Sequence, residues 1–338
     1  MEWWVSMPKI ELHAHLNGSI RDSTLLELAR VLGEKGAIVF SDVEHVIMKN
    51  DRSLGEVFKL FDLIHILTTD HKTVTRITKE VVEDFASENV VYLELRTTPK
   101  KNDSIGMSKQ SYMEAVIEGL RAVTAVDIDF VPHKINTQDS LNSIAMNDAC
   151  DGTRRKKTYV RLLLSIDRRE TTEAAIETVK LALEMRGLGV VGIDLSGNPG
   201  VGEWNTFLPA LKFAQEQGLY ITLHCGREEE WRQLKTSKIP VEICLTSNIK
   251  TESISSIDIH HFVDLYNAKH PLVLCTDDAG VFSTSLSNEY KLASTAFGLG
   301  KREMFELARN GIEFIFAGDD VKQYLVGAFD SAAKKLNL

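Results

Sequence analysis

The stretch YITLHCGREEEWRQLKTSKIPVEICL, residues 220–245, contains two apolar, strand-like runs that are joined by one charged segment with helical spacing. The runs are Tyr220–His224 and Val241–Leu245, with Gly226 after the first and Pro240 before the second. Two continuous apolar strands linked by a helical crossover are typical of a parallel sheet that is covered on both faces. This stretch therefore predicts an α/β fold.

The same strand-and-helix unit recurs along the chain. Further strand-like runs lie at Lys9–Leu16, Val90–Leu95, Tyr159–Ile166, Val190–Leu195 and Leu272–Thr276. Helical patterns cover Ser23–Leu32, Leu54–Leu67, Val74–Phe85, Ala174–Met185 and Phe207–Glu216. The section from about Pro132 to Lys157 is rich in Asn, Ser and Asp and predicts a long surface loop. No linker divides the chain, so we predict a single barrel domain over residues 1–338.

The interval between the two strands of the opening stretch is short. Predicted strand starts are 31, 31, 20 and 31 residues apart; they lie near Thr158, Gly189, Tyr220, Pro240 and Pro271. The 13 residues 227–239 suffice for one crossover of roughly 10–12 residues, but not for helix, strand and helix. Our count is seven strands, whereas the closed parallel barrel has eight. We therefore predict a TIM-type barrel whose sixth βα unit is missing or incomplete. Alternatively, Asp127–Val131 supplies the eighth strand and the short interval has no significance.

Composition limits the class of protein. The 338 residues are 43% hydrophobic and carry a net charge of −9, which argues against a nucleic-acid polymer as partner but leaves a small anionic ligand open. The four cysteines form no CxxC pair, which is consistent with reduced thiols. No signal-peptide pattern and no membrane span of roughly 18 apolar residues is found. We predict a cytoplasmic protein without a membrane partner.

Histidine and aspartate side chains stand at the ends of three predicted strands. His13 and His15 are two residues apart, so both imidazoles point to the same side of a strand. His224 and Asp277 each end another strand. Any one of these is more often an ordinary polar residue at a strand end, but together they form a ligand set suited to zinc, with a position left for water.

Seven motifs extend over nearly the whole chain. They are PKIELHAHLNGSI (8–20), YLELRTTPK (92–100), LLLSIDRRE (162–170), GIDLSGNP (192–199), LHCG (223–226), EICLTSN (242–248) and LCTDD (274–278). In this order they resemble the adenosine and AMP deaminase family, and most closely its adenosine deaminase-like branch, the N6-methyl-AMP deaminases. The resemblance implies a (β/α)8 barrel that holds one zinc ion per chain through His13, His15, His224 and Asp277. We expect the protein to be a monomer.

The resemblance also implies a pocket for a purine nucleotide. Its residues would be His15, Asn17, His65, Thr97, Thr98, Pro99, Lys100, Asp167, Gly197 and Asp278. The TTPK segment favours a phosphate site, because hydroxyls, turn amides and an ammonium can all donate to phosphate oxygens. Two of the residues have a simpler interpretation: His65 as a buried helix residue, and Asp167 as half of a surface ion pair with a neighbouring arginine.

The family reaction, as the resemblance gives it, replaces the C6 amino or alkylamino group of a purine by hydrolysis. Zinc acidifies the attacking water, a glutamic acid protonates the ring, a further histidine assists proton transfer, and Asp278 would hold the ring or the water. The family has H-x-x-E after the fifth strand, but the third residue after His224 is Arg227. No histidine occurs between Gly226 and Pro240 either. A block that carries both catalytic groups is therefore predicted to be absent.

Two functions remain open from the sequence. The chain is either a working zinc deaminase of N6-methyl-AMP, which releases IMP and an amine with another group as acid, or a catalytically inactive, truncated member that binds zinc and nucleotide. Glu228, Glu229 and Glu230 could replace the acid, although a solvated helix start explains them better. His260 and His261 lie beyond the seventh strand and are poor replacements. A third reading, another metal-dependent hydrolase, does not require the purine-specific motifs.

Overall fold

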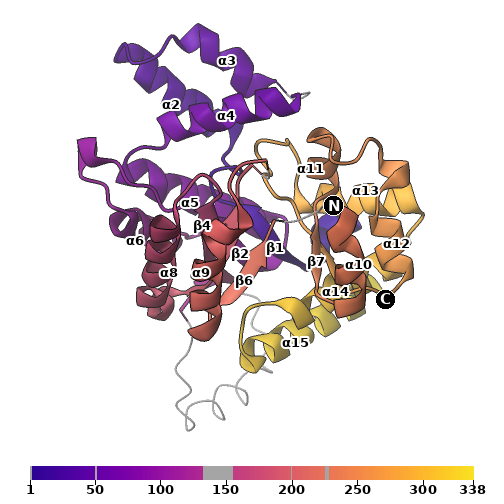
Figure 1. Ribbon diagram of the computed structural model, residues 1–338. Coiled ribbons are helices and arrows are strands. Elements are labelled where there is room, and N and C mark those ends of the chain that lie inside the picture. The colour runs from indigo at the N-terminus through magenta and orange to yellow at the C-terminus, as the bar shows by residue number, and fades with distance from the viewer. Residues whose placement is uncertain (1, 50–51, 132–154, 199, 225–227) are drawn as a thin grey trace.

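The computed structural model describes residues 2–49, 52–131, 155–198, 200–224 and 228–338. Parallel strands form a curled sheet at the centre, and helices surround it (Figure 1). The strands are β1 Lys9–His15, β2 Val90–Thr97, β3 Asp127–Asp129, β4 Lys157–Asp167, β5 Val190–Ser196, β6 Tyr220–Leu223, β7 Val241–Ile243 and β8 Leu272–Leu274. All seven predicted strands are thus confirmed, although β7 and β8 are only three residues long.

Helices follow most of the strands, as the sequence predicts. They are α1 Trp3–Ser6, α2 Asp22–Glu34, α3 Phe40–Met48, α4 Leu54–Leu67, α5 His71–Ser87, α6 Lys109–Arg121, α8 Thr172–Glu184, α9 Trp204–Glu216, α10 Glu228–Ser237, α11 Leu245–Lys250, α12 Phe262–Asn267, α13 Leu286–Phe297, α14 Lys301–Asn310 and α15 Asp319–Leu336. Short 3-10 helices lie at η1 Asp103–Ile105, η2 Arg186–Leu188, η3 Ile257–Ile259 and η4 Gly311–Phe314. Among the described helices, none combines the length and the apolar character needed to cross a bilayer.

The sheet brings the first strand, β1, next to the segment that follows the last strand, β8. Five strands pair in parallel in the order β1-β2-β4-β5-β6, and β7 pairs with β8. The two groups of strands meet where β1 ends: the amide of His15 donates to the carbonyl of Asp277 at 2.9 Å, and the amide of Asp277 donates to the carbonyl of His13 at 2.7 Å. This is the α/β architecture of a TIM-type barrel, as predicted.

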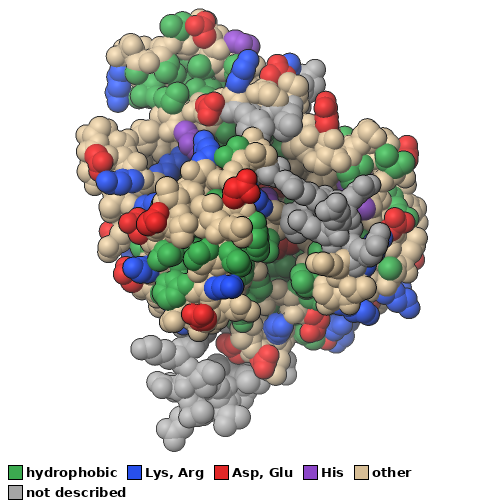
Figure 2. Space-filling view, viewed as in Figure 1, with side chains coloured by type: hydrophobic (Ala, Val, Ile, Leu, Met, Phe, Trp, Pro, Cys, Tyr) green, Lys and Arg blue, Asp and Glu red, His purple; other side chains and the backbone are tan. Residues whose placement is uncertain are grey.

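The barrel is open between β6 and β7. In the part of the chain that the structure describes, no pairing joins these two strands. The strands β1, β2, β4 and β5 are largely buried, whereas β6 leaves Tyr220 48% and Leu223 42% exposed. Figure 2 shows hydrophobic side chains gathered over β6, next to a hollow. The strand β6 is therefore an edge, and α10 is the only described element between it and β7.

The segment that could have supplied an eighth barrel strand does form a strand, but elsewhere. Asp129 of β3 pairs with Tyr159 of β4, and Tyr159 pairs on its other side with Tyr92 of β2. The strand β3 therefore flanks the start of β4 and does not lie between β6 and β7. The predicted loop from Pro132 falls mostly outside the described residues.

Three helices, α2, α3 and α4, lie apart from the others, next to one end of the barrel (Figure 1). Arg52, which is only 4% exposed, joins them to the barrel. Its guanidinium donates to the carbonyl oxygens of Val46 and Ile47 at the end of α3, and to that of Val281 in the loop after β8. These helices are thereby held beside the loop that follows Asp277.

Candidate active site

The four predicted metal ligands meet at the C-terminal ends of the strands. His13 and His15 lie on β1, His224 follows β6, and Asp277 follows β8. One donor atom from each lies within 4.8 Å of all the others. Strands far apart in the sequence thus deliver three imidazoles and one carboxylate to a single point, as expected for this edge of a parallel barrel.

The spacing of these donors fits a tetrahedral zinc ion. Nε2 of His224 lies 3.1 Å from Nε2 of His13 and 3.2 Å from Nε2 of His15. Oδ1 of Asp277 lies 3.3 Å from Nε2 of His13 and 3.4 Å from Nε2 of His15. Bonds of about 2.0–2.1 Å to a central zinc ion require tetrahedral edges of about 3.3 Å. The chemistry of the donor set and its spacing therefore both fit a metal.

Two carboxylates orient the imidazoles. Oε2 of Glu242 lies 2.6 Å from Nδ1 of His13, and Oδ1 of Asp194 lies 3.1 Å from Nδ1 of His224. Each carboxylate accepts the Nδ1 proton, which leaves the Nε2 lone pair directed at the centre of the cluster. Arg96 donates to Glu242 at 2.9 Å and to Asp194 at 3.2 Å. This buried guanidinium therefore links the supports of two separate ligands.

The charged states of two of the ligands, Asp277 and His15, also suit a cation. Burial alone would raise the pKa of the Asp277 carboxyl, but its contacts with His13, His15 and His224 hold this pKa well below its usual range. Its second oxygen accepts a hydrogen bond from the Ser247 hydroxyl at 2.7 Å. Burial lowers the pKa of His15 to about 3, so its ring is neutral and able to bind a metal.

Next to the cluster, two acceptor atoms lack a protein partner. Among the described atoms, neither Oδ1 of Asn17 nor Oδ1 of Asp278 has a hydrogen bond. Burial, and then the charge of Asp277, raise the pKa of Asp278 well above its usual value. Gly18 is required here, because a Cβ atom at this position would lie 1.6 Å from Oδ1 of Asp278. Thr97, at the end of β2, is buried with its hydroxyl 2.8 Å from that of Tyr112.

A second group of predicted residues gathers around Lys100. Its ammonium donates to the Thr68 hydroxyl at 3.0 Å, and burial lowers its pKa to about 8. His65 is not the buried helix residue of the simpler interpretation, because its ring remains accessible on α4. Desolvation by the surrounding protein, and then the charges of Lys100 and Arg169, lower the pKa of His65 to about 4.

Asp167 forms the ion pair that its simpler interpretation predicts, and it also lies beside another candidate. Its carboxylate accepts from Nη2 of Arg169 at 2.6 Å and from the Arg169 amide at 2.8 Å. A Cβ atom at Gly197, whose φ is +97°, would lie 3.1 Å from Oδ1 of Asp167. Pro99 is buried and Thr98 half-buried at the end of β2.

Several important side chains were not predicted from the sequence. The signal that could have revealed them is a charged residue within a mostly apolar strand, where charges are rarely buried without a partner. This description fits Glu242, Asp194 and Arg96. Arg227, which the sequence predicts to stand at the position of the family's acid, lies outside the described residues. The helix α10 begins at Glu228, which confirms that the REEE run leads into a helix.

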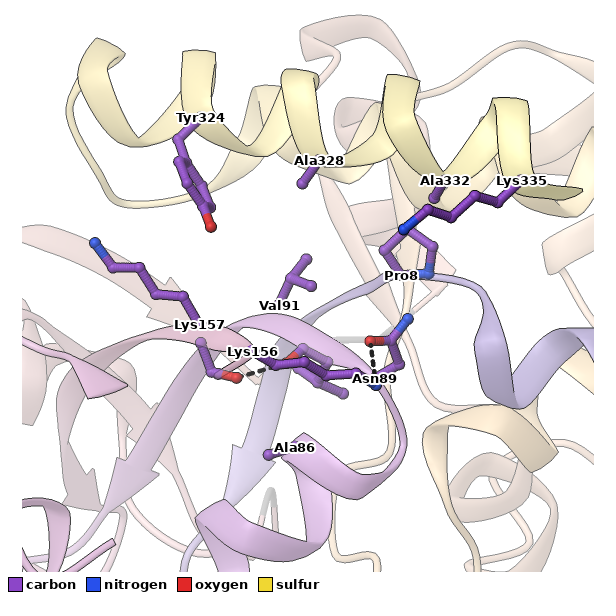
Figure 3. Close-up of a pocket in the computed structure, with 12 residues that line it drawn as sticks. Pro8, Ala86, Asn89, Val91, Lys156, Lys157, Tyr324, Ala328, Ala332 and Lys335 are labelled. Atoms are coloured by element: carbon purple, nitrogen blue, oxygen red, sulfur yellow. Dashed lines mark hydrogen bonds between the residues drawn. The ribbon is translucent and has the colours of Figure 1, made fainter. Parts of the chain in front are cut away.

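A separate pocket of about 310 Å³ lies near the starts of the strands (Figure 3). It is bounded by α15 and by residues at the starts of β2 and β4; these include Val91, Lys157, Tyr324 and Lys335. None of the predicted metal or nucleotide residues lines it. The candidate site is therefore at the strand ends and not in this pocket.

Comparison with known proteins agrees with this geometry. The family model described as Adenosine deaminase matches residues 8–232 and 229–332. The N6-mAMP deaminase of Arabidopsis thaliana is 70% identical over 358 residues, which cover 98% of this chain and 99% of that protein. This alignment is 20 positions longer than the 338 residues of the chain, so at least that many positions have no residue of this chain.

Solved structures share the fold. The crystal structure of Arabidopsis ADAL complexed with IMP has a TM-score of 0.90 and 68% identity, over 99% of each chain. A Burkhoderia ambifaria amidohydrolase with bound Zn has a TM-score of 0.75 and 20% identity, over 99% of this chain and 94% of that one. The chain belongs to the adenosine deaminase family, in the branch formed by the N6-methyl-AMP deaminases.

Proposed function

We propose that the chain binds one zinc ion through His13, His15, His224 and Asp277. The observation that carries this proposal is the spacing of their donor atoms: four of the distances between them are 3.1 to 3.4 Å, which suits bonds to one central zinc ion. The carboxylates of Glu242 and Asp194 support it. When bound, zinc supplies an acidified water that can attack a purine at C6.

The substrate class that fits the surrounding residues is a purine nucleoside monophosphate with an alkylated C6 amine. We propose N6-methyl-AMP, which the reaction would convert to IMP and methylamine. The unpartnered oxygen of Asn17 is suited to accept the exocyclic N–H of the base, and the Asp278 carboxyl, when protonated, can donate to a ring nitrogen. Lys100 and the hydroxyls of Thr97 and Thr98 are suited to a phosphate. The Arabidopsis structure with IMP supports the same class.

We further propose that this chain turns the reaction over slowly, because it lacks the block that carries the family's glutamic acid and second histidine. Three observations support a missing block: the gaps in the alignment with the Arabidopsis relative, the family match in two parts, and the lack of pairing between β6 and β7 in the described chain. Arg227 cannot replace the acid, since a guanidinium does not release a proton near neutral pH.

The number of absent catalytic groups determines how much of the catalytic rate we expect this chain to lose. General acid–base catalysis by one positioned group typically contributes about 10²–10⁴-fold. Two such groups are absent together, and their losses need not multiply, because groups that act as a unit are not additive. Binding of zinc and nucleotide depends on other residues, so we expect it to survive the loss of turnover.

Purified protein would first be analysed for zinc, with one ion per chain expected. A His13→Ala, His15→Ala double variant should lose it, and no zinc after refolding with the metal would contradict the assignment. The protein would then be incubated with N6-methyl-AMP and zinc, and formation of IMP followed.

The matched comparison is a variant that receives the Arabidopsis segment missing between Gly226 and Glu228. We expect it to form IMP at least about 100-fold faster than the parent chain. Fast turnover by the parent that His224→Ala abolishes would instead show that another group, such as Glu228, Glu229 or Glu230, serves as the acid.

A further inference from the structure

The metal ligand His224 stands at the end of a strand that is held from one side only. Its amide donates to the carbonyl of Leu195 in β5 at 3.0 Å, and β6 pairs with β5 alone in the described chain. Asp194 fixes the orientation of the ring through Nδ1. Neither contact involves the carbonyl side of His224, and an edge strand with a free flank can shift its backbone more readily than a central one.

Arg168 makes the contact that restrains this backbone. It follows β4, and its guanidinium extends past the end of β5 to donate from Nη2 to the carbonyl oxygen of His224 at 2.8 Å. A cationic donor on a neutral carbonyl forms a stronger hydrogen bond than a neutral one. The bond therefore fixes the residue whose ring nitrogen lies 3.1 Å from that of His13.

The base of Arg168 is itself held in place. Its amide donates to the carbonyl of Ser196 at 3.0 Å. A Cβ atom at Gly202, whose φ is +76°, would lie 2.3 Å from the Arg168 carbonyl oxygen, so the loop after β5 packs directly against this backbone. The guanidinium therefore acts from a rigid base, which is a requirement for setting the position of another residue.

We propose that Arg168 is a positioning residue, which holds the end of the edge strand β6 so that His224 meets the other metal ligands. The part that concerns the metal rests on the zinc site proposed above. The contact between Arg168 and the backbone of His224 does not, so the two can be tested separately.

Arg186, in η2, provides a matched control, because it holds the segment that leads into the same strand. Its Nη2 donates to the carbonyl oxygen of Gln217 at 2.7 Å, just before β6 begins. Arg186→Gln thus removes the same kind of bond from the opposite end of β6. Hydrogen exchange of the full chain without metal would be compared for the parent, Arg168→Gln and Arg186→Gln. We expect the His224 amide to exchange about tenfold faster in Arg168→Gln and at the parent rate in Arg186→Gln.

A second readout reports the geometry at the metal. Cobalt(II) would replace zinc, and its visible spectrum and its loss to a chelator would be followed. Arg168→Gln should alter the spectrum and release the metal about tenfold faster, whereas Arg186→Gln should do neither. If Arg168→Gln does not fold, Arg168→Lys and Arg186→Lys give the same comparison.

Equal exchange at His224 in the two variants would overturn the proposal. A difference in exchange in a chain that binds no metal would leave the backbone restraint standing and refute the zinc site instead. Equal spectra and equal metal release, in a chain that does bind cobalt, would show that Arg168 does not position the ligand.

Discussion

The ring of Tyr220, at the start of β6, stacks on the ring of Phe316, with centroids 4.3 Å apart and planes inclined by 5°. The amide of Phe316 in turn donates to the buried Glu94 carboxylate at 2.6 Å. This contact ties the edge strand to the segment before α15. Since no second strand flanks β6 in the described structure, the stack carries more of its stability than in a closed barrel.

We therefore expect Tyr220→Ala to lower the free energy of unfolding by about 1–2 kcal/mol, even though the side chain is half exposed. Tyr220→Phe keeps the stacking surface and should change stability by less than about 0.5 kcal/mol. Urea titrations would measure both variants. A Tyr220→Ala midpoint equal to that of the parent would mean that the stack contributes nothing.

Glu242 is expected to set metal affinity without touching the metal. Glu242→Gln removes the charge that faces Nδ1 of His13, and it leaves Asp194 as the carboxylate that still forms an ion pair with Arg96. Loss of such a support typically reduces metal affinity about 10–100-fold. Competition with a chelator would measure the change. Glu313→Gln, in the exposed part of η4, is the control and should leave affinity unchanged.

Lys100 should make nucleotide binding depend on pH. Its folded pKa of about 8 lies below the model-compound value of 10.5, so the protonated form destabilises the folded chain at neutral pH, and this penalty disappears as the pH rises from about 8 to 10.5. Nucleotide affinity depends on pH in the opposite direction, because the phosphate binds the protonated, charged form of Lys100. Affinity for N6-methyl-AMP should fall up to about tenfold per pH unit above pH 8.

Isothermal titration between pH 7 and 9.5 would measure this dependence. N6-methyladenosine, which lacks the phosphate, should show no such fall, and neither should Lys100→Arg, which stays charged. Parallel curves for nucleotide and nucleoside would place the phosphate elsewhere.

Inserting the segment that we propose to be missing should increase the stability of the fold as well as the rate of turnover. A strand between β6 and β7 would cover the exposed side chains of Tyr220 and Leu223 and pair two free edges. Burial of these groups predicts a gain of about 2–4 kcal/mol in the free energy of unfolding. Urea titrations of both chains would measure it, with equal midpoints and cooperativity arguing that the barrel closes without the block.

The sequence alone predicts the strands and the meeting of four polar residues at their ends, for different physical reasons. Predominantly apolar runs such as Val190–Leu195 indicate strands of a parallel sheet, and His13, His15, His224 and Asp277 stand at the ends of such runs. The supports of the site could not be assigned. That Glu242 meets His13, or that Arg168 reaches His224, depends on the curvature of the sheet, which no local pattern encodes.

Because β1 lies beside the segment after β8, a metal ion bound there would cross-link the first and last strands of the sheet. One ion would join residue 13 to residue 277 and both to residue 224, on the border of the open side. A cross-link between such distant positions removes much of the freedom of the unfolded chain, and the entropy of loop closure grows with the length enclosed. Metal should therefore act here as a covalent staple would, and its removal should allow the first and last strands to separate before the rest of the sheet.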